Sequence, residues 1–163
     1  VYKSQTEYRN YRLEEDPKVK EEWLEQARET KGQIELLTKG FPSNSMLLIA
    51  DAKLNIADEK YSNAATKLEE VIARGGRISG STYAFAAIAA LERGETGHGL
   101  MRINQALAVE PNPYYLLIKG RASLRAGKQA DAIAAAEQLL EFVPESEDGQ
   151  ALLCGARPGV HIA

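Results

Sequence analysis

The sequence predicts an all-α fold built as a stack of helical hairpins. One observation is an internal repeat, in which Gly94 and Gly127 stand 33 residues apart, as do Pro111 and Pro144. The other is that apolar residues between these positions recur at intervals of three and four, the period of an amphipathic helix. A repeat of roughly 20–50 residues is typical of solenoids, in which each unit packs on its neighbours.

Each repeat is predicted to contain two helices. The first helix of the last repeat is expected from Pro113 to Ala126 and to end at Gly127, because glycine readily adopts the left-handed conformation of a helix C-cap. The second helix is expected from about Gln129 to Phe142. Pro144 prevents its continuation, since proline has no backbone N–H for the helix ladder.

An earlier repeat lies 35 residues further back, with weaker boundaries. Glu59 there takes the place of the turn glycine, and Gly76 takes that of the closing proline. The small residues Ala52, Ala87 and Gly120 fall in the middle of the three first helices. Glycine in that position costs about 1 kcal/mol relative to alanine, so we expect close approach of the partner helix at Gly120.

Capping segments are expected at both ends. Asp16 and Pro17 form a strong helix start, and one apolar stripe continues to about Lys39 before Gly40 and Pro42 stop the helix. We expect this helix to cap the stack or to be the second helix of a degenerate first unit. In either case Trp23 is expected to lie in the core. At the other end, residues 147–156 predict a closing helix. In the closing helix, Leu152 and Leu153 are expected to cover the last unit. The apolar stripe of the N-terminal helix consists of Val19, Trp23, Ala27, Ile34 and Leu37.

The charge and cysteine content narrow the class of protein. The net charge is −3 and is spread evenly, so neither duplex nucleic acid nor an anionic membrane surface is expected as the main partner. The single Cys154 excludes an intrachain disulfide and a multi-cysteine zinc site. No apolar run approaches the roughly 20 residues of a membrane helix. The cytoplasm is favoured, while the start at Val1 leaves open a periplasmic protein or a membrane-tethered fragment.

The sequence offers little for catalysis or metal binding. His98 has no histidine or cysteine at metal-ligand spacing, and His161 lies two residues from the end of the sequence. No H-E-x-x-H, G-x-S-x-G or phosphate-loop pattern occurs. His98 is interpreted as a solvated residue at a helix start. The pair Glu69 and Glu70 is interpreted as part of a solvated face, and Cys154 as a small buried hydrophobe. We therefore expect no catalytic residue, no metal site and no cofactor.

Residues 45–144 resemble three tetratricopeptide repeats (TPRs). The resemblance rests on the small residues, turn glycines and closing prolines above, together with the small residues that open the second helices, Ala64, Gly99 and Ala132. It implies a right-handed α-α superhelix within one domain, 1–163. The expected parts are an N-terminal tail and capping helix 1–42, repeats 45–76, 80–111 and 113–144, and a capping helix 147–156.

The resemblance also implies a function, because the first helices of such repeats line a concave groove that holds a partner's peptide or helix. Arg121 and Arg125 are neighbours on one helix face, and their donors suit a carboxylate, so an acidic partner is favoured. We expect a non-catalytic adaptor or scaffold. The repeat register places these residues in the groove: Met46, Ile49, Lys53, Phe85, Ile88, Tyr114, Leu117, Arg121 and Arg125.

One subtype is not expected. TPR domains that clamp the C-terminal tails of Hsp70 and Hsp90 use asparagines and cations at defined groove positions. The matching positions here hold Ile49, Lys53, Phe85, Tyr114 and Ile118, with no asparagine. Two alternatives to a monomeric adaptor stay open: the TPR portion of a larger enzyme or membrane-anchored assembly factor, and a scaffold that forms homo-oligomers through its exposed ends.

Overall fold

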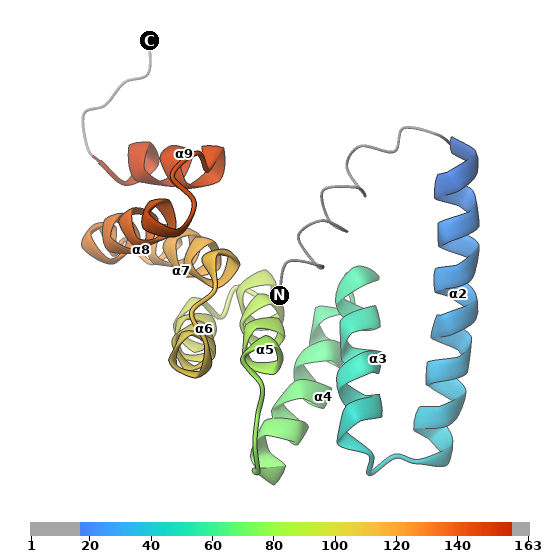
Figure 1. Ribbon diagram of the computed structural model, residues 1–163. Coiled ribbons are helices and arrows are strands. Elements are labelled where there is room, and N and C mark those ends of the chain that lie inside the picture. Colours follow the sequence, from blue (N-terminus) through green and yellow to red (C-terminus); the bar gives the residue numbers. More distant parts are fainter. Residues whose placement is uncertain (1–16, 158–163) are drawn as a thin grey trace. The chain divides into compact units, whose positions relative to one another are not determined.

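The computed structural model describes residues 17–157 and is all-α across them (Figure 1). Side chains are described from Glu25 onward, with the exception of Ala27. The all-α prediction is confirmed. The described helices are α2 (Pro17–Gly40), α3 (Ser45–Ala57), α4 (Tyr61–Arg74), α5 (Gly80–Glu92), α6 (Thr96–Val109), α7 (Pro113–Arg125), α8 (Gln129–Phe142) and α9 (Glu147–Ala156).

The chain divides into two compact units, residues 1–47 and residues 48–163. The first unit contains α2, and the second contains most of α3 and all helices after it. We call α3 with α4 hairpin 1, α5 with α6 hairpin 2, and α7 with α8 hairpin 3. The division expected from the sequence, one domain with repeats 45–76, 80–111 and 113–144, remains a prediction.

The three hairpins share one turn geometry. Gly94 and Gly127 have φ angles of 80° and 72°, so both expected turn glycines adopt the left-handed conformation. Glu59 adopts it too, with a φ of 59°, although it has a side chain. In each turn, the residue after the left-handed one donates a backbone hydrogen bond to a carbonyl near the end of the preceding helix. The N–H of Lys60, for example, donates to the carbonyl of Asn55 over 2.7 Å. This pattern closes a helix C-terminus and reverses the chain.

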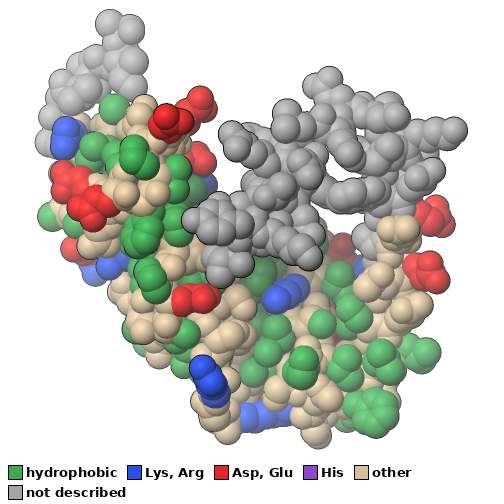
Figure 2. Space-filling view, in the orientation of Figure 1, with side chains coloured by type: hydrophobic (Ala, Val, Ile, Leu, Met, Phe, Trp, Pro, Cys, Tyr) green, Lys and Arg blue, Asp and Glu red, His purple; other side chains and the backbone are tan. Residues whose placement is uncertain are grey.

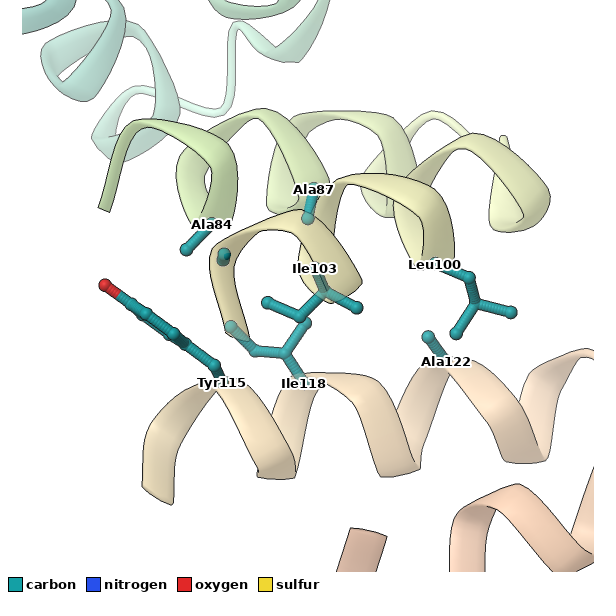
Figure 3. Packing of buried hydrophobic residues seen from close by; sticks show 8 residues of the cluster. Ala84, Ala87, Leu100, Ile103, Tyr115, Ile118 and Ala122 are labelled. Atoms are coloured by element: carbon teal, nitrogen blue, oxygen red, sulfur yellow. The ribbon is translucent and has the colours of Figure 1, made fainter. Parts of the chain in front are cut away.

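Three apolar clusters follow one another through the second unit, and each joins a hairpin to the helix that comes next. Ile103 lies at the centre of the middle cluster, between α5 and α7 (Figure 3). Because α5 and α7 each contribute to two clusters, every hairpin is packed against its neighbour, as in a solenoid. The clusters contain Ala52, Ala64, Ala65, Leu68, Ala86 and Ala89; then Ala84, Ala87, Leu100, Ile103, Ala106, Tyr115, Ile118 and Ala122; then Leu116, Leu117, Ala136, Leu139 and Leu152.

Gly120 is required by a close approach, as the sequence suggests, but the neighbour differs from the expected one. A Cβ atom at Gly120 would lie 2.2 Å from Cδ2 of Leu152. Leu152 belongs to α9, whereas the expected neighbour was the hairpin partner α8. The closing helix therefore packs directly on α7, and Leu152 and Leu153 cover hairpin 3 as expected.

The N-terminal helix has its expected limits, since α2 begins at Pro17 and ends at Gly40. Ile34 is half-buried and Leu37 is exposed. The side chain of Trp23 lies outside the described residues, as do residues 1–16 and His161. The role of α2 as a cap, with Trp23 in the core, therefore remains a prediction.

Candidate partner-binding face

The residues predicted for the groove lie on the first helices of the three hairpins. In Figure 1, α5, α7 and α9 follow the inner side of the curve traced by hairpins 2 and 3, and α6 and α8 follow its outer side. Figure 2 shows a basic side chain among hydrophobic ones over α3 and α5, and acidic side chains over α9. We call the surface that the predicted residues form on α3, α5 and α7 the groove face.

Lys53 and Phe85 meet where α3 and α5 are adjacent. The Nζ atom of Lys53 lies 5.0 Å from the centroid of the Phe85 ring, within the range of a cation–π interaction. Lys53 is exposed, while Phe85 is half-buried against the first apolar cluster. Ile49 packs against the same cluster, so a rigid core supports this part of the groove face.

The α7 part of the groove face carries an aromatic residue and two arginines. Tyr114 is 52% exposed at the start of α7, and Arg121 and Arg125 are exposed further along it. The Nη2 atom of Arg121 donates a hydrogen bond to Oδ1 of Asp148 on α9 over 3.0 Å. The acidic neighbour of Arg121 thus comes from α9, the second helix after α7.

Leu117 has a different environment from the other predicted groove residues. It is only 7% exposed and packs with Leu116, Leu139 and Leu152 in the third cluster. Ala84, the equivalent residue of α5, is buried in the same way by the cluster that α5 forms with α6 and α7. Packing of α9 makes Leu117 part of the core, and Arg121 and Arg125 are the exposed groove residues of the C-terminal half of α7.

A second polar cluster joins α4 to α6. Glu69 accepts a hydrogen bond from Nε of Arg102 over 3.0 Å and a further one from Nη2, and Nε2 of His98 lies 2.8 Å from its Oε1. Partial burial alone would raise the pKa of Glu69, but the hydrogen bonds from Arg102 and His98 hold it below its ordinary value. The interpretation of Glu69 and His98 as solvated residues is therefore wrong, because each is paired across the hairpin boundary.

This Glu69 cluster joins two repeats and has a counterpart further along the chain. Glu137 stands 68 residues after Glu69, at the same repeat position, and accepts a hydrogen bond from Arg157 over 3.4 Å. A search of the sequence for acids at equivalent repeat positions would have found these residues. The intermediate repeat holds Asn104 at this position, so the acid recurs in two of the three repeats.

The described part of the chain contains no group of three His, Cys, Asp or Glu residues that could hold a metal ion. Cys154 is a free, half-buried thiol in α9. Within residues 17–157, no helix combines the length and the apolar character needed to span a bilayer. The groove face is thus the candidate site that the arrangement favours.

No protein-family model matches the sequence. No curated protein matches it either. Solved structures do match: MamA has a TM-score of 0.75 at 16% identity, over 88% of this chain and 84% of its own. YrrB, a TPR protein with an unusual peptide-binding site, has a TM-score of 0.72 at 12% identity, over 83% and 70%. The second TPR domain of human RPAP3, in complex with an HSP70 peptide, has a TM-score of 0.62 at 19% identity, over 69% and 98%. At these identities the likeness concerns the fold.

Proposed function

Because this chain has the fold of tetratricopeptide-repeat proteins, we propose that it is a non-catalytic protein-interaction module whose groove face binds a peptide or helix of a partner protein. The observation that carries the proposal is the Lys53–Phe85 pair, a cation and an aromatic ring from two hairpins held on a buried alanine-rich core. Tyr114 adds a second aromatic residue on the next hairpin.

The residue types on the groove face support this function. Aromatic residues and arginine are enriched among the side chains that dominate binding energy, particularly where a rigid scaffold holds them. Phe85 and Ile88 are half-buried against their clusters, so their positions are set before a partner arrives. Preorganisation of this kind reduces the entropy that ordering costs on binding.

The structural neighbours support the class of ligand. YrrB is described as having a peptide-binding site, and the RPAP3 domain holds a peptide in its complex. We propose for this chain the same general mode of binding, in which a peptide lies on a TPR surface. We do not propose an HSP70 tail as the ligand, because the groove positions of that subtype hold no asparagine here and one of them, Ile118, is buried.

Affinity capture with charge-matched variants tests the proposal. Wild type, the double variant Arg121→Glu/Arg125→Glu, and the control Arg93→Glu/Arg157→Glu would each be checked for folding by circular dichroism and then used to capture proteins from a native lysate. The control reverses the same number of charges at positions outside the groove face. The captured partner would then be purified and its affinity for each variant measured by calorimetry.

We expect wild type and the control to bind the partner with similar affinity and the groove variant to lose at least tenfold, about 1.4 kcal/mol. Equal binding by all three proteins would place the interface elsewhere. A loss shared by both double variants would indicate a general charge effect and would count against the groove face.

Self-association is a second candidate, favoured by exposed apolar side chains near the end of the first unit. Leu36, Phe41 and Met46 are all strongly exposed there, with Met46 at 80%. Light scattering over a hundredfold range of concentration would test it. A mass that doubles in wild type and stays monomeric in Phe41→Ser would support a scaffold, and a constant monomer mass would exclude it.

A further inference from the structure

We propose that Arg121 forms a carboxylate subsite of the groove face, and that Asp148 of α9 occupies it until an acidic side chain of a partner peptide displaces it. This inference rests on the proposed function and adds the class of ligand side chain and an internal competitor. It starts from the Arg121–Asp148 bond, which shows that a carboxylate fits against this guanidinium at 3.0 Å.

The bond between Arg121 and Asp148 leaves the arginine accessible. One contact, from Nη2, joins the two residues, whereas a guanidinium has five N–H donors. The side chains of Arg121 and Asp148 are 60% and 62% exposed, so water and a partner can both reach them. An exposed ion pair of this kind is weak, because solvent screens the charges and both side chains lose rotational freedom.

Release of Asp148 is inexpensive because α9 continues to stabilise it. Asp148 lies in the first turn of α9, where the helix macrodipole favours a negative charge. Ser146 caps the same helix end by accepting a hydrogen bond from the Gly149 N–H over 3.1 Å. The carboxylate can therefore leave Arg121 without disturbing the helix that carries it.

Charge complementarity identifies the displacing group as a side-chain carboxylate. Arg125 lies one turn from Arg121 on α7 and is exposed, so two cations stand in line along the groove face. The present occupant of Arg121 is itself an acidic side chain at the start of a helix. A glutamate or aspartate within a partner segment reproduces that group and gains Arg125 as a second contact.

The chain contains a matched control for this ion pair. Arg157 donates one hydrogen bond to Glu137 over 3.4 Å, and these side chains are 51% and 55% exposed. Asp148→Asn and Glu137→Gln each remove one negative charge from an exposed pair. The first change alters the proposed subsite, and the second removes the same charge from an exposed ion pair on α8, outside the groove face.

The test titrates the full chain with blocked hexapeptides and follows backbone amide shifts by NMR. The probes are hexaglutamate with both ends blocked, hexaglutamine with both ends blocked, and hexaglutamine with a free C-terminal carboxylate. The proteins are wild type, Arg121→Gln, Asp148→Asn and Glu137→Gln, all at one ionic strength because screening affects each arm. Amides around Arg121 and Gly149 report occupancy of the subsite.

We expect blocked hexaglutamate to bind wild type and Glu137→Gln with similar affinity, and Asp148→Asn about 1.4- to 5-fold more tightly, the equivalent of about 0.2–1 kcal/mol. Arg121→Gln should lose the shifts at Gly149. Absence of hexaglutamate binding to wild type, equal tightening in Glu137→Gln, or binding of only the free carboxylate would each overturn the proposal. Partner capture reports on the groove face separately, so a normal capture result beside a failed titration would reject the subsite and keep the proposed function.

Discussion

Arg102 of α6 donates from Nε to Glu69 of α4 over 3.0 Å, although the two residues stand 33 positions apart in the chain. The side chain of Arg102 is only 12% exposed, and that of Glu69 is 34% exposed. The contact therefore joins the second helices of hairpins 1 and 2 at a partly desolvated point. Removing it changes packing between repeats and leaves the local helix contacts intact.

Replacing Glu69 with glutamine should lower the free energy of unfolding by about 1 kcal/mol. Hydrogen bonds to charged groups contribute about 1.5–3 kcal/mol, and partial exposure of Glu69 reduces that amount. Glu137→Gln, which affects a longer and more exposed bond to Arg157, should change stability by no more than about 0.5 kcal/mol. Urea unfolding of both variants measures the difference, and equal losses would contradict it.

The lowered pKa of Glu69 predicts a dependence of stability on pH. The folded state binds this proton more weakly than the unfolded chain, whose carboxyl keeps its ordinary pKa of 4.5. The stabilisation is therefore complete above that ordinary pKa and is lost as the pH falls through it and below. The stability gap between wild type and Glu69→Gln should shrink between about pH 6 and pH 3. Urea unfolding across that range tests this, and a constant gap would show that Glu69 titrates normally.

Ser123→Ala should stabilise the protein. The Oγ atom of Ser123 is buried and has no hydrogen-bond partner among the described residues. The equivalent position of hairpin 2 is Ala90, which is buried. Its backbone carbonyl accepts a turn hydrogen bond from the Glu95 N–H, as the carbonyl of Ser123 does from the Lys128 N–H, so the turn does not need the hydroxyl. Removing an unsatisfied hydroxyl and inserting a better helix former should raise the free energy of unfolding by about 1 kcal/mol. A lower urea midpoint for Ser123→Ala would indicate that a water molecule satisfies the hydroxyl.

Glu59→Gly should also stabilise the protein, by about 0.5–1 kcal/mol. Glu59 adopts the left-handed conformation that its counterparts Gly94 and Gly127 adopt without strain. The reverse change, Gly94→Ala, should cost about 1 kcal/mol for the same reason. Thermal unfolding of both variants provides the measurement, and changes of the same sign in the two would refute the steric argument.

The limits of individual helices could be predicted from the sequence because they depend on local chemistry. Pro113, Pro144 and the turn glycine Gly127 act through their own backbones, so the limits of α7 and α8 follow from residue type. The register placed Lys53 and Phe85 on one surface, and the two side chains lie within cation–π range of each other. Their part in partner binding remains a prediction.

Contacts between repeats could not be predicted in the same way. Arg121 meets Asp148 and Arg102 meets Glu69 across 27 and 33 residues, and the repeat register gives the face on which each residue lies but not its partner on another helix. Leu117 was assigned to the groove because apolar periodicity does not distinguish a core-facing from a groove-facing position. In the structure α9 covers Leu117 as α7 covers its repeat equivalent Ala84, and both residues are buried.

The packing of Leu152 on Gly120 sets an order of assembly during synthesis. Hairpin 3 is complete in sequence at Phe142, yet Leu117 and Gly120 obtain part of their final environment only from α9. Until α9 emerges from the ribosome, this edge of α7 stays open, because each solenoid unit is stabilised mainly by its neighbour. The interface between α7 and α9 can therefore form only after α9 has left the ribosome.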